Sequence, residues 1–181
     1  MIRYIAALVL ALANILGSTE AEAQSTLHGP AYIGVIEAVV DGRRVPLERL
    51  SGVMAARSRS MFIGGVEAGW DFDGRSSPIR IRQGQEFFFV ARFSNESDPQ
   101  AIFAMNRMKQ TKKARMVPIM RTGSILQSSG TVRNTEFVIP LTFEPYEKDF
   151  VKIQPASPLA PGEYIISFGG GAARGFGLGV D

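Results

Sequence analysis

The sequence contains no cysteine and only one histidine, His28. Without cysteine there is no disulfide framework and no attachment point for a lipoprotein anchor, so the fold must depend on its hydrophobic core. Blue-copper centres and the common zinc sites take several histidine or cysteine ligands, which this chain cannot supply. We therefore predict no cofactor and no metal site of these kinds.

Sequence signatures of nucleophilic catalysis are also absent. Beyond residue 23 there is no S-x-x-K and no G-x-S-x-G segment, and a Ser-His-Asp triad would have to use His28. A calcium-binding EF-hand loop fails as well, because a loop with Gly74 at its sixth position has Arg80 at its twelfth, where a glutamate is required. We predict that the chain is not an enzyme.

The only long apolar run lies at the N-terminus. Arg3 precedes an apolar run over residues 5–16, and Ala21-Glu22-Ala23 follows a short stretch of small and polar residues. A charged start, about a dozen apolar residues and an A-x-A site are typical of a secretory signal peptide, whereas a membrane-spanning helix needs about 20 apolar residues. We predict a signal peptide over residues 1–23 and export to the periplasm or beyond. The mature residues 24–181 should form a single domain without a transmembrane segment.

Short segments with a two-residue period dominate the rest of the chain. Asp41-Gly42 and Gln83-Gly84-Gln85 are turn signals, and we expect residues 79–82 and 86–93 to pair across the second of them. Such segments also occur at residues 32–42, 135–143, 149–155, 163–168 and 175–181.

Convincing helical periodicity is missing from every stretch of a dozen residues. The best helical candidate is residues 100–114, where Ile102, Met105 and Met108 fall near one face, but a strand followed by a polar loop fits equally well. Seven to nine short strands in a chain of this length predict an all-β fold, an antiparallel β-sandwich.

The C-terminal segment refines this expectation. Leu159-x-Pro161-Gly162-Glu163-Tyr164 resembles the approach to a late strand of immunoglobulin-like folds. The whole ending is similar to that of exported bacterial β-sandwich proteins with an FG-x-x-D-like last strand. The resemblance implies an immunoglobulin-like sandwich with a tyrosine corner, in which the Tyr164 hydroxyl bonds to the backbone just before it.

The last strand should carry side chains on one face only. Phe176, Leu178 and Val180 alternate with Gly175, Gly177 and Gly179, which leaves one face of the strand bare. A phosphate-binding loop is excluded because no helix follows these glycines. A bare face costs stability unless something packs closely against the backbone, so we expect an aromatic ring to lie across it.

Basic residues are concentrated in the middle of the chain, while the formal net charge is only +3. No acidic residue occurs between Asp98 and Glu136. The segment could contact an anionic polysaccharide, a lipid headgroup or an acidic partner, or it could be a solvated loop. Nucleic acid is disfavoured because no aromatic residues are interleaved for base stacking. The candidate contact residues are Arg107, Lys109, Lys112, Lys113, Arg115 and Arg121.

Two classes of function fit these observations. The first is an exported cell-envelope protein with a non-catalytic binding or structural role, which contacts a protein partner or an anionic envelope component. The second is a hydrolase or carbohydrate-active domain that uses carboxylates brought together only by the fold. Glu144, Glu147 and Asp149 are close in sequence, but three acids along one turn usually face water.

Overall fold

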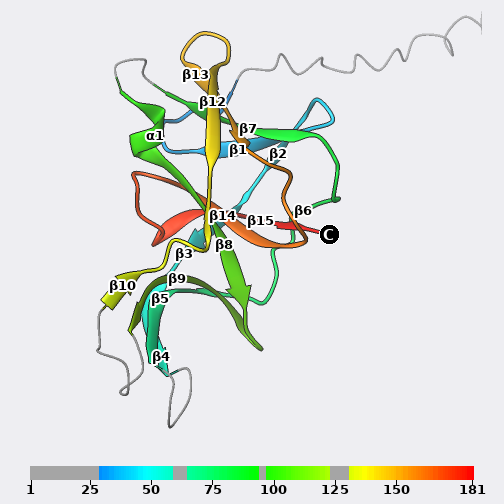
Figure 1. Cartoon of the computed structure of the whole chain (residues 1–181). Coiled ribbons are helices and arrows are strands. Elements are labelled where there is room, and N and C mark those ends of the chain that lie inside the picture. The colour runs from blue at the N-terminus through cyan, green and yellow to red at the C-terminus, as the bar shows by residue number, and fades with distance from the viewer. Residues whose placement is uncertain (1–28, 59–64, 94–96, 123–130) are drawn as a thin grey trace, which may run out of the picture.

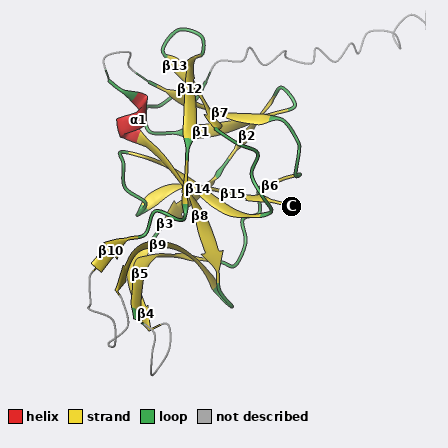
Figure 2. Cartoon of the chain, viewed as in Figure 1, coloured by secondary structure: helices red, strands yellow, loops and turns green. Residues whose placement is uncertain are grey.

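The computed structural model describes residues 29–58, 65–93, 97–122 and 131–181. The expected signal peptide and His28 lie outside these residues. The described chain is built almost entirely of β-strands, and its only helix is the single turn α1 (Pro99–Ile102), with Asp98 as its N-cap (Figure 2). The prediction of an all-β fold with antiparallel sheets is confirmed.

Five strands form the first sheet, in the order β12-β13-β7-β1-β2, and every pair in it is antiparallel. Asp41 and Gly42 join β1 to β2 with φ angles of 50° and 75°, the left-handed backbone that a two-residue hairpin turn requires. The strands are β1 (Ile36–Val40), β2 (Arg43–Pro46), β7 (Phe87–Arg92), β12 (Leu141–Pro145) and β13 (Phe150–Pro155).

The second sheet is larger and follows the order β3-β15-β14-β8-β9-β5-β4, with β6, β10 and β11 attached to β15, β9 and β8. Its pairs are antiparallel except the short parallel pairing of β6 with β15. The strands are β3 (Glu48–Ser51), β4 (Val53–Ser58), β5 (Val66–Asp73), β6 (Arg80–Ile81), β8 (Phe103–Gln110), β9 (Ala114–Thr122), β10 (Thr131–Arg133), β11 (Val138–Ile139), β14 (Gly162–Phe168) and β15 (Arg174–Val180).

The main core lies between the two sheets, as in a β-sandwich. In Figure 1 the five-stranded sheet is at the top and β14, β15 and β8 cross the middle. Phe89 and Ile153 of the first sheet are fully buried in one cluster with Met105, Ile166 and Leu178 of the second. Burying a side chain of this size is worth about 1.5–3 kcal/mol, so this layer holds the sheets together.

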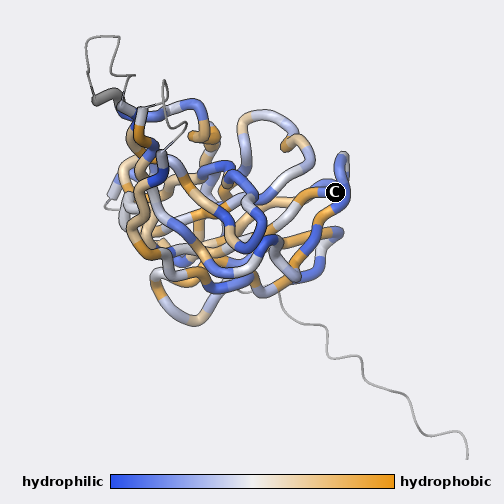
Figure 3. Tube along the Cα trace, turned by 90° about the horizontal axis from the view of Figure 1, so that it is seen from below, coloured by the Kyte–Doolittle hydropathy of each residue, from blue (hydrophilic) through white to orange (hydrophobic). Residues whose placement is uncertain are grey.

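A second, smaller core lies on the other face of β14 and β15. The large sheet curls so that β9, β5 and β4 pass below β14, β15 and β3 (Figure 1). Leu50, Phe72, Met108, Val117 and Ile165 fill the space between them. Because β14 is covered on both faces, five consecutive residues of it, 163–167, are buried. Over much of the rest of the chain, hydrophilic and hydrophobic residues follow one another at short intervals (Figure 3).

The expected hairpin over residues 79–93 is wrong. β6 pairs with β15 in the large sheet, whereas β7 pairs with β1 and β13 in the small sheet. The turn between them therefore connects the two layers of the sandwich. Ile81 and Phe89 are both buried in the main core, but they enter it from opposite sheets. A two-residue period does not distinguish this arrangement from a hairpin.

Of the two interpretations of residues 100–114, the helix is wrong and the strand followed by a polar loop is confirmed. Only the α1 turn is helical, and the chain continues from Phe103 as β8, then turns at residues 111–113 into β9. Met105 and Met108 lie on opposite faces of β8 and contribute to different cores, Met105 to the main core and Met108 to the second. A strand between two apolar layers needs large apolar residues on both faces, which imitates a weak helical pattern.

Candidate ligand-binding groove

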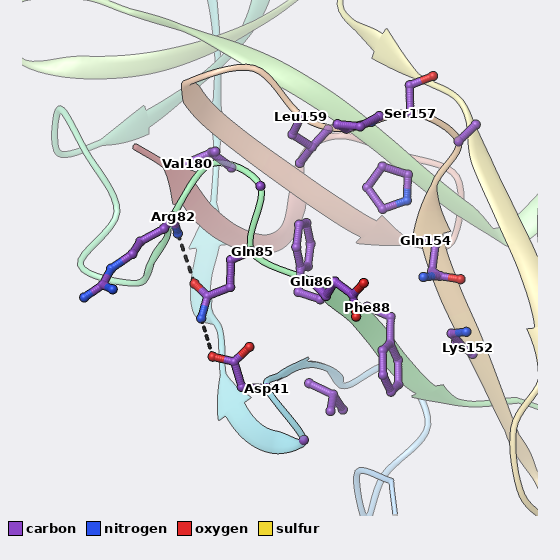
Figure 4. A pocket seen from close by; sticks show the side chains of 17 residues that line it. Asp41, Arg82, Gln85, Glu86, Phe88, Lys152, Gln154, Ser157, Leu159 and Val180 are labelled. Carbon is purple, nitrogen blue, oxygen red and sulfur yellow. Dashed lines mark hydrogen bonds between the residues drawn. The ribbon is translucent and has the colours of Figure 1, made fainter.

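A groove of about 590 Å³ opens at one end of the five-stranded sheet, where three loops meet. The β1–β2 turn, the turn before β7 and the segment after β13 contribute to it (Figure 4). Several lining residues are polar, and two phenylalanines accompany them. The residues that define its chemistry are Asp41, Gln85, Glu86, Phe88, Lys152 and Gln154.

A chain of hydrogen bonds connects two of these loops. The Gln85 side-chain amide donates to Asp41 Oδ2 at 2.6 Å, and its Oε1 accepts from the backbone N–H of Arg82 at 3.1 Å (Figure 4). The left-handed φ of Asp41 is part of the β1–β2 turn and sets the position of its carboxylate. This wall of the groove is therefore held by side chains and is independent of any ligand.

Lys152 anchors the other wall. Its ammonium lies 3.0 Å from Glu144 Oε2 and 5.3 Å from the centre of the Phe88 ring. Phe88 also contacts Tyr146, with ring centres 5.5 Å apart. These side chains project from the outer face of the small sheet, where β7 and β13 are neighbours. The contacts limit the side-chain freedom that a ligand would otherwise have to remove on binding.

Four polar lining side chains, those of Arg82, Glu86, Gln154 and Ser157, are available to a ligand, and two of them lie beside Phe88. Among the described residues, the side chains of Glu86 and Gln154 make no hydrogen bond or ion pair, and Figure 4 shows both beside Phe88 and Lys152. Together they offer carboxylate oxygens, an amide oxygen and an amide N–H₂. The charged lining residues balance, since Asp41 and Glu86 are acidic while Arg82 and Lys152 are basic. Such a lining suits a polar ligand without a large net charge.

The structure removes Arg115 from the candidate anion contacts. Its side chain is 0% exposed and its guanidinium makes a two-pronged ion pair with Glu48, at 2.7 and 2.8 Å. Two further hydrogen bonds run to the carbonyls of Asp73 and Gly74. A buried guanidinium without these partners would be very costly, so Arg115 is committed to the interior. Its place in a basic run gave no indication of this.

Two more of the predicted contacts already have partners. Lys109 bonds to both carboxylate oxygens of Glu67 at 2.7 and 2.9 Å and lies 4.9 Å from the centre of the Phe137 ring. Arg107 is exposed on β8 and donates to the Pro161 carbonyl at 2.9 Å. Arg107 keeps solvent-facing charge, whereas Lys109 is largely neutralised by its carboxylate.

The remaining predicted contacts are exposed but do not form one patch. Lys112 and Lys113 lie in the turn between β8 and β9, and Arg121 lies near the far end of β9. At about 3.3 Å per strand residue, roughly 26 Å separates Lys113 from Arg121. The basic segment of the sequence is thus distributed along a hairpin.

The bare glycine face of β15 is covered, but the aromatic ring expected there is wrong. A side chain at Gly175 would meet the Ile166 carbonyl oxygen at 2.6 Å and the Ile165 side chain at 2.8 Å, and one at Gly177 would meet the Leu50 side chain at 2.7 Å. At Gly179 the space is taken by the guanidinium of Arg80. The face therefore packs against two aliphatic side chains and one arginine.

A network of charges that runs from the surface into the interior explains the need for space at Gly179. Arg80 forms ion pairs with Glu163 and with Asp181, and Glu163, 1% exposed, also accepts the backbone N–H of Ser77 at 2.8 Å. The oxygen that accepts from Ser77, Glu163 Oε2, also lies 3.5 Å from the guanidinium of Arg115, whereas Arg80 pairs with Oε1. The network ties β6, β9 and β14 together, so the glycines serve the fold and do not form a site.

The tyrosine corner is present. The Tyr164 hydroxyl donates to the carbonyl of Ala160, four residues upstream, at 2.7 Å, and the ring is buried in the main core. Burial raises the pKa of this hydroxyl, which the nearby Arg107 opposes. The predicted local contact is confirmed.

The structure places the three acids of the expected turn, Glu144, Glu147 and Asp149, in and beside the β12–β13 turn. Glu144 is paired with Lys152, and Glu147 and Asp149 have the left-handed φ angles of 51° and 68° that shape the β12–β13 turn. Within the described ranges, no group of three histidine, cysteine or acidic side chains could hold a metal ion.

No protein-family model, curated protein or solved structure matches this chain significantly. In the part of the chain that the structure describes, no helix is long and apolar enough to cross a bilayer.

The groove was not predicted from the sequence, although both turns that line it, Asp41-Gly42 and Gln83-Gly84-Gln85, are recognisable there. What brings them together is the pairing of β1 with β7.

Proposed function

We propose that this chain is an exported, non-catalytic binding protein of the cell envelope and that the groove in Figure 4 holds its ligand. The observation that carries this proposal is the presence of Glu86 and Gln154, two polar side chains without partners among the described residues, in a groove whose walls are braced by other contacts. Ligand sites are usually formed before the ligand binds and contain a few polar groups that are free to bond to it.

The ligand that fits best is a neutral or charge-balanced segment of a partner protein. The two acidic and two basic side chains that line the groove disfavour a polyanion. The backbone N–H and C=O groups of a peptide could form hydrogen bonds with the Glu86 carboxylate and the Gln154 amide. The exposed Lys112 and Lys113 are the alternative contact, for an anionic polysaccharide or lipid headgroup. The two possibilities involve separate residues and can be tested against each other.

Export and the immunoglobulin-like arrangement belong to the same proposal. Residues 1–23 have the pattern of a signal peptide, and the Tyr164 corner between two facing sheets supports an immunoglobulin-like domain over residues 24–181. N-terminal sequencing of the protein recovered from the periplasm or medium should begin at Gln24. Recovery of an uncleaved chain from the cell interior would contradict export.

The binding site is tested by capture from an envelope extract of the host cell. We compare the tagged wild-type protein with the double variant Glu86→Ala/Gln154→Ala and with Lys112→Glu/Lys113→Glu as a matched double control. Losing two hydrogen-bonding side chains should weaken binding by about tenfold or more. The control should capture as much partner as the wild type does.

The opposite pattern would locate binding elsewhere. If the lysine variant alone loses capture, and the loss is reproduced with vesicles rich in anionic lipid, the basic turn is the contact surface. If both variants capture equally well, the groove proposal is wrong. Circular dichroism and melting temperature should be unchanged in both variants, because all four side chains are solvent-accessible.

One observation favours a second candidate, a carboxylate-based hydrolase. Asp41 and Glu86 line the same groove. Most glycoside hydrolases use a pair of carboxylate side chains for catalysis. Incubation with a panel of glycosides and polysaccharides tests this. Hydrolysis that disappears in both Asp41→Asn and Glu86→Gln would establish an enzyme and replace the binding proposal.

A further inference from the structure

The ten-stranded sheet ends in an unprotected strand. β4 is its last strand and pairs with β5 on one side only, and no strand among the described residues pairs with its outer edge. An open edge presents backbone N–H and C=O groups that can pair with another chain. Natural proteins usually guard such edges with lysine, proline or a bulge. β4 contains neither lysine nor proline.

The single charge on β4 is already neutralised. Arg57 forms an ion pair with Asp71 on the neighbouring strand β5. The other residues of β4 are Val53, Met54, Ala55, Ala56 and Ser58. The edge therefore has no uncompensated charge to repel an identical edge.

An apolar strip continues from β4 across the sheet. Directly paired residues point to the same face, so Met54 shares a face with Trp70, and Ala56 shares it with Ala68 and Met120. The exposed fractions are 50% for Met54 and 40% for Met120, which are high for methionine. All of these residues are uncharged. The opposite face differs, because it carries the Arg57–Asp71 pair and Glu67.

We propose that β4 pairs antiparallel with β4 of a second copy of this chain and that the two large sheets join into one. A two-fold axis perpendicular to the sheet keeps each face on its own side and passes midway between a residue and its copy in the partner subunit. If the two copies of Ala55 are opposed in this way, Met54 lies opposite Ala56 of the partner subunit. The two neutral strips then become continuous, and the exposed Met54 side chain gains a cross-strand contact with an uncharged residue.

The same register separates the like charges. Arg57 lies opposite Val53 of the partner subunit, and the two arginines are about 13 Å apart along the strands. A second copy is the occupant that needs no complementary charge, which fits the neutral edge. A charged partner would find nothing to recognise there.

This dimer leaves the groove accessible. In Figure 1, β4 is at the lower end of the molecule, whereas β1, β7 and β13, which border the groove, lie at the upper end. Dimerisation at β4 and ligand binding are therefore independent, and each can fail without the other.

Analytical ultracentrifugation of the purified protein over about 1–200 µM tests the proposal. We expect a dimer that dissociates on dilution. Met54→Lys/Ala56→Lys should raise the dissociation constant by tenfold or more, because it adds edge charges of the kind that block pairing. Val138→Lys is the matched control, since Val138 is 48% exposed on a different strand, β11. It should leave the dissociation constant unchanged.

A single introduced cysteine tests the register in a chain that has none. Opposed residues of an antiparallel pair have Cα atoms about 4.5–5.5 Å apart, within the range of a disulfide. Ala55→Cys should therefore form a disulfide-linked dimer on mild oxidation, and Val138→Cys should not. A monomeric wild type over the whole range, equal dimerisation of the lysine double variant, or equal cross-linking of both cysteine variants would overturn the proposal. A melting temperature unchanged in Met54→Lys/Ala56→Lys shows that the fold is intact.

Discussion

The guanidinium of Arg80 occupies the space that a side chain at Gly179 would need. From there Arg80 reaches Glu163 on β14 and Asp181 at the end of β15, so the missing side chain at residue 179 makes room for both ion pairs. The alternating glycines of the last strand thus permit close packing, at Gly179 by a charged group and at Gly175 and Gly177 by aliphatic ones.

Gly179→Ala should destabilise the protein by about 1–3 kcal/mol, because the new methyl group displaces Arg80 from its two carboxylates. The free energy of unfolding in urea measures this. Gly171→Ala is the control, since Gly171 is exposed with no atom near the position of the added carbon. That variant should stay within about 0.5 kcal/mol of the wild type. Equal losses in the two variants would contradict the packing explanation.

Arg115→Met should cost about 3–5 kcal/mol in the free energy of unfolding, since it leaves the partly buried Glu48 without its cation and leaves the buried Glu163 with Arg80 alone. Removing an exposed ion pair by Glu144→Gln should cost less than about 1 kcal/mol. Chemical denaturation of both variants checks the contrast. A loss below about 1 kcal/mol in Arg115→Met would contradict the buried ion pair between Arg115 and Glu48.

Tyr164→Phe should reduce stability by about 0.5–1.5 kcal/mol through loss of the hydrogen bond to Ala160. The pKa of the Tyr164 hydroxyl is raised in the folded protein. Its contribution is therefore complete below the ordinary tyrosine pKa of about 10 and is lost as the pH rises beyond that value. Wild-type stability should fall more steeply than that of Tyr164→Phe above pH 10. Tyr146→Phe should follow the wild type, because the Tyr146 hydroxyl makes no hydrogen bond among the described residues.

Asp181→Asn should alter the acid limb of the stability curve. The hydrogen bond from Arg80 holds the pKa of the Asp181 carboxylate below its ordinary value. The stabilisation by this pair is thus present above about pH 4 and disappears as the pH falls through the lowered pKa. Thermal melts between pH 2 and 7 should show a shallower acid decline in the variant than in the wild type. Parallel curves would show that Asp181 does not contribute.

Several features were predictable because they depend on local pattern. The Asp41-Gly42 turn requires left-handed backbone at both residues, and this dipeptide adopts it readily. The pairing of β14 with β15 follows from two adjacent strand-like segments joined by a short glycine-rich loop. Tyr164 could be assigned to a corner because the bonded carbonyl is only four residues away.

Errors arose where a pattern is compatible with two environments. Residues 79–82 alternate as a strand does, but alternation does not say which sheet the strand joins, and β6 joins β15. Arg115 lies in a basic run, yet its burial depends on Glu48, which is 67 residues away in sequence. The groove could not be predicted for the same reason, because its lining residues come from segments more than a hundred residues apart in the sequence.

The sequence by itself determined the strand-forming character of this chain, its turns and the face that the last strand buries, because these follow from side-chain period and from backbone preferences over a few residues. Tertiary structure alone decided which sheet each strand joined, which charges were buried together, where the groove opened and which edge stayed unpaired. These outcomes depend on contacts between distant segments, whose free energies are set by packing and desolvation after the layers have met.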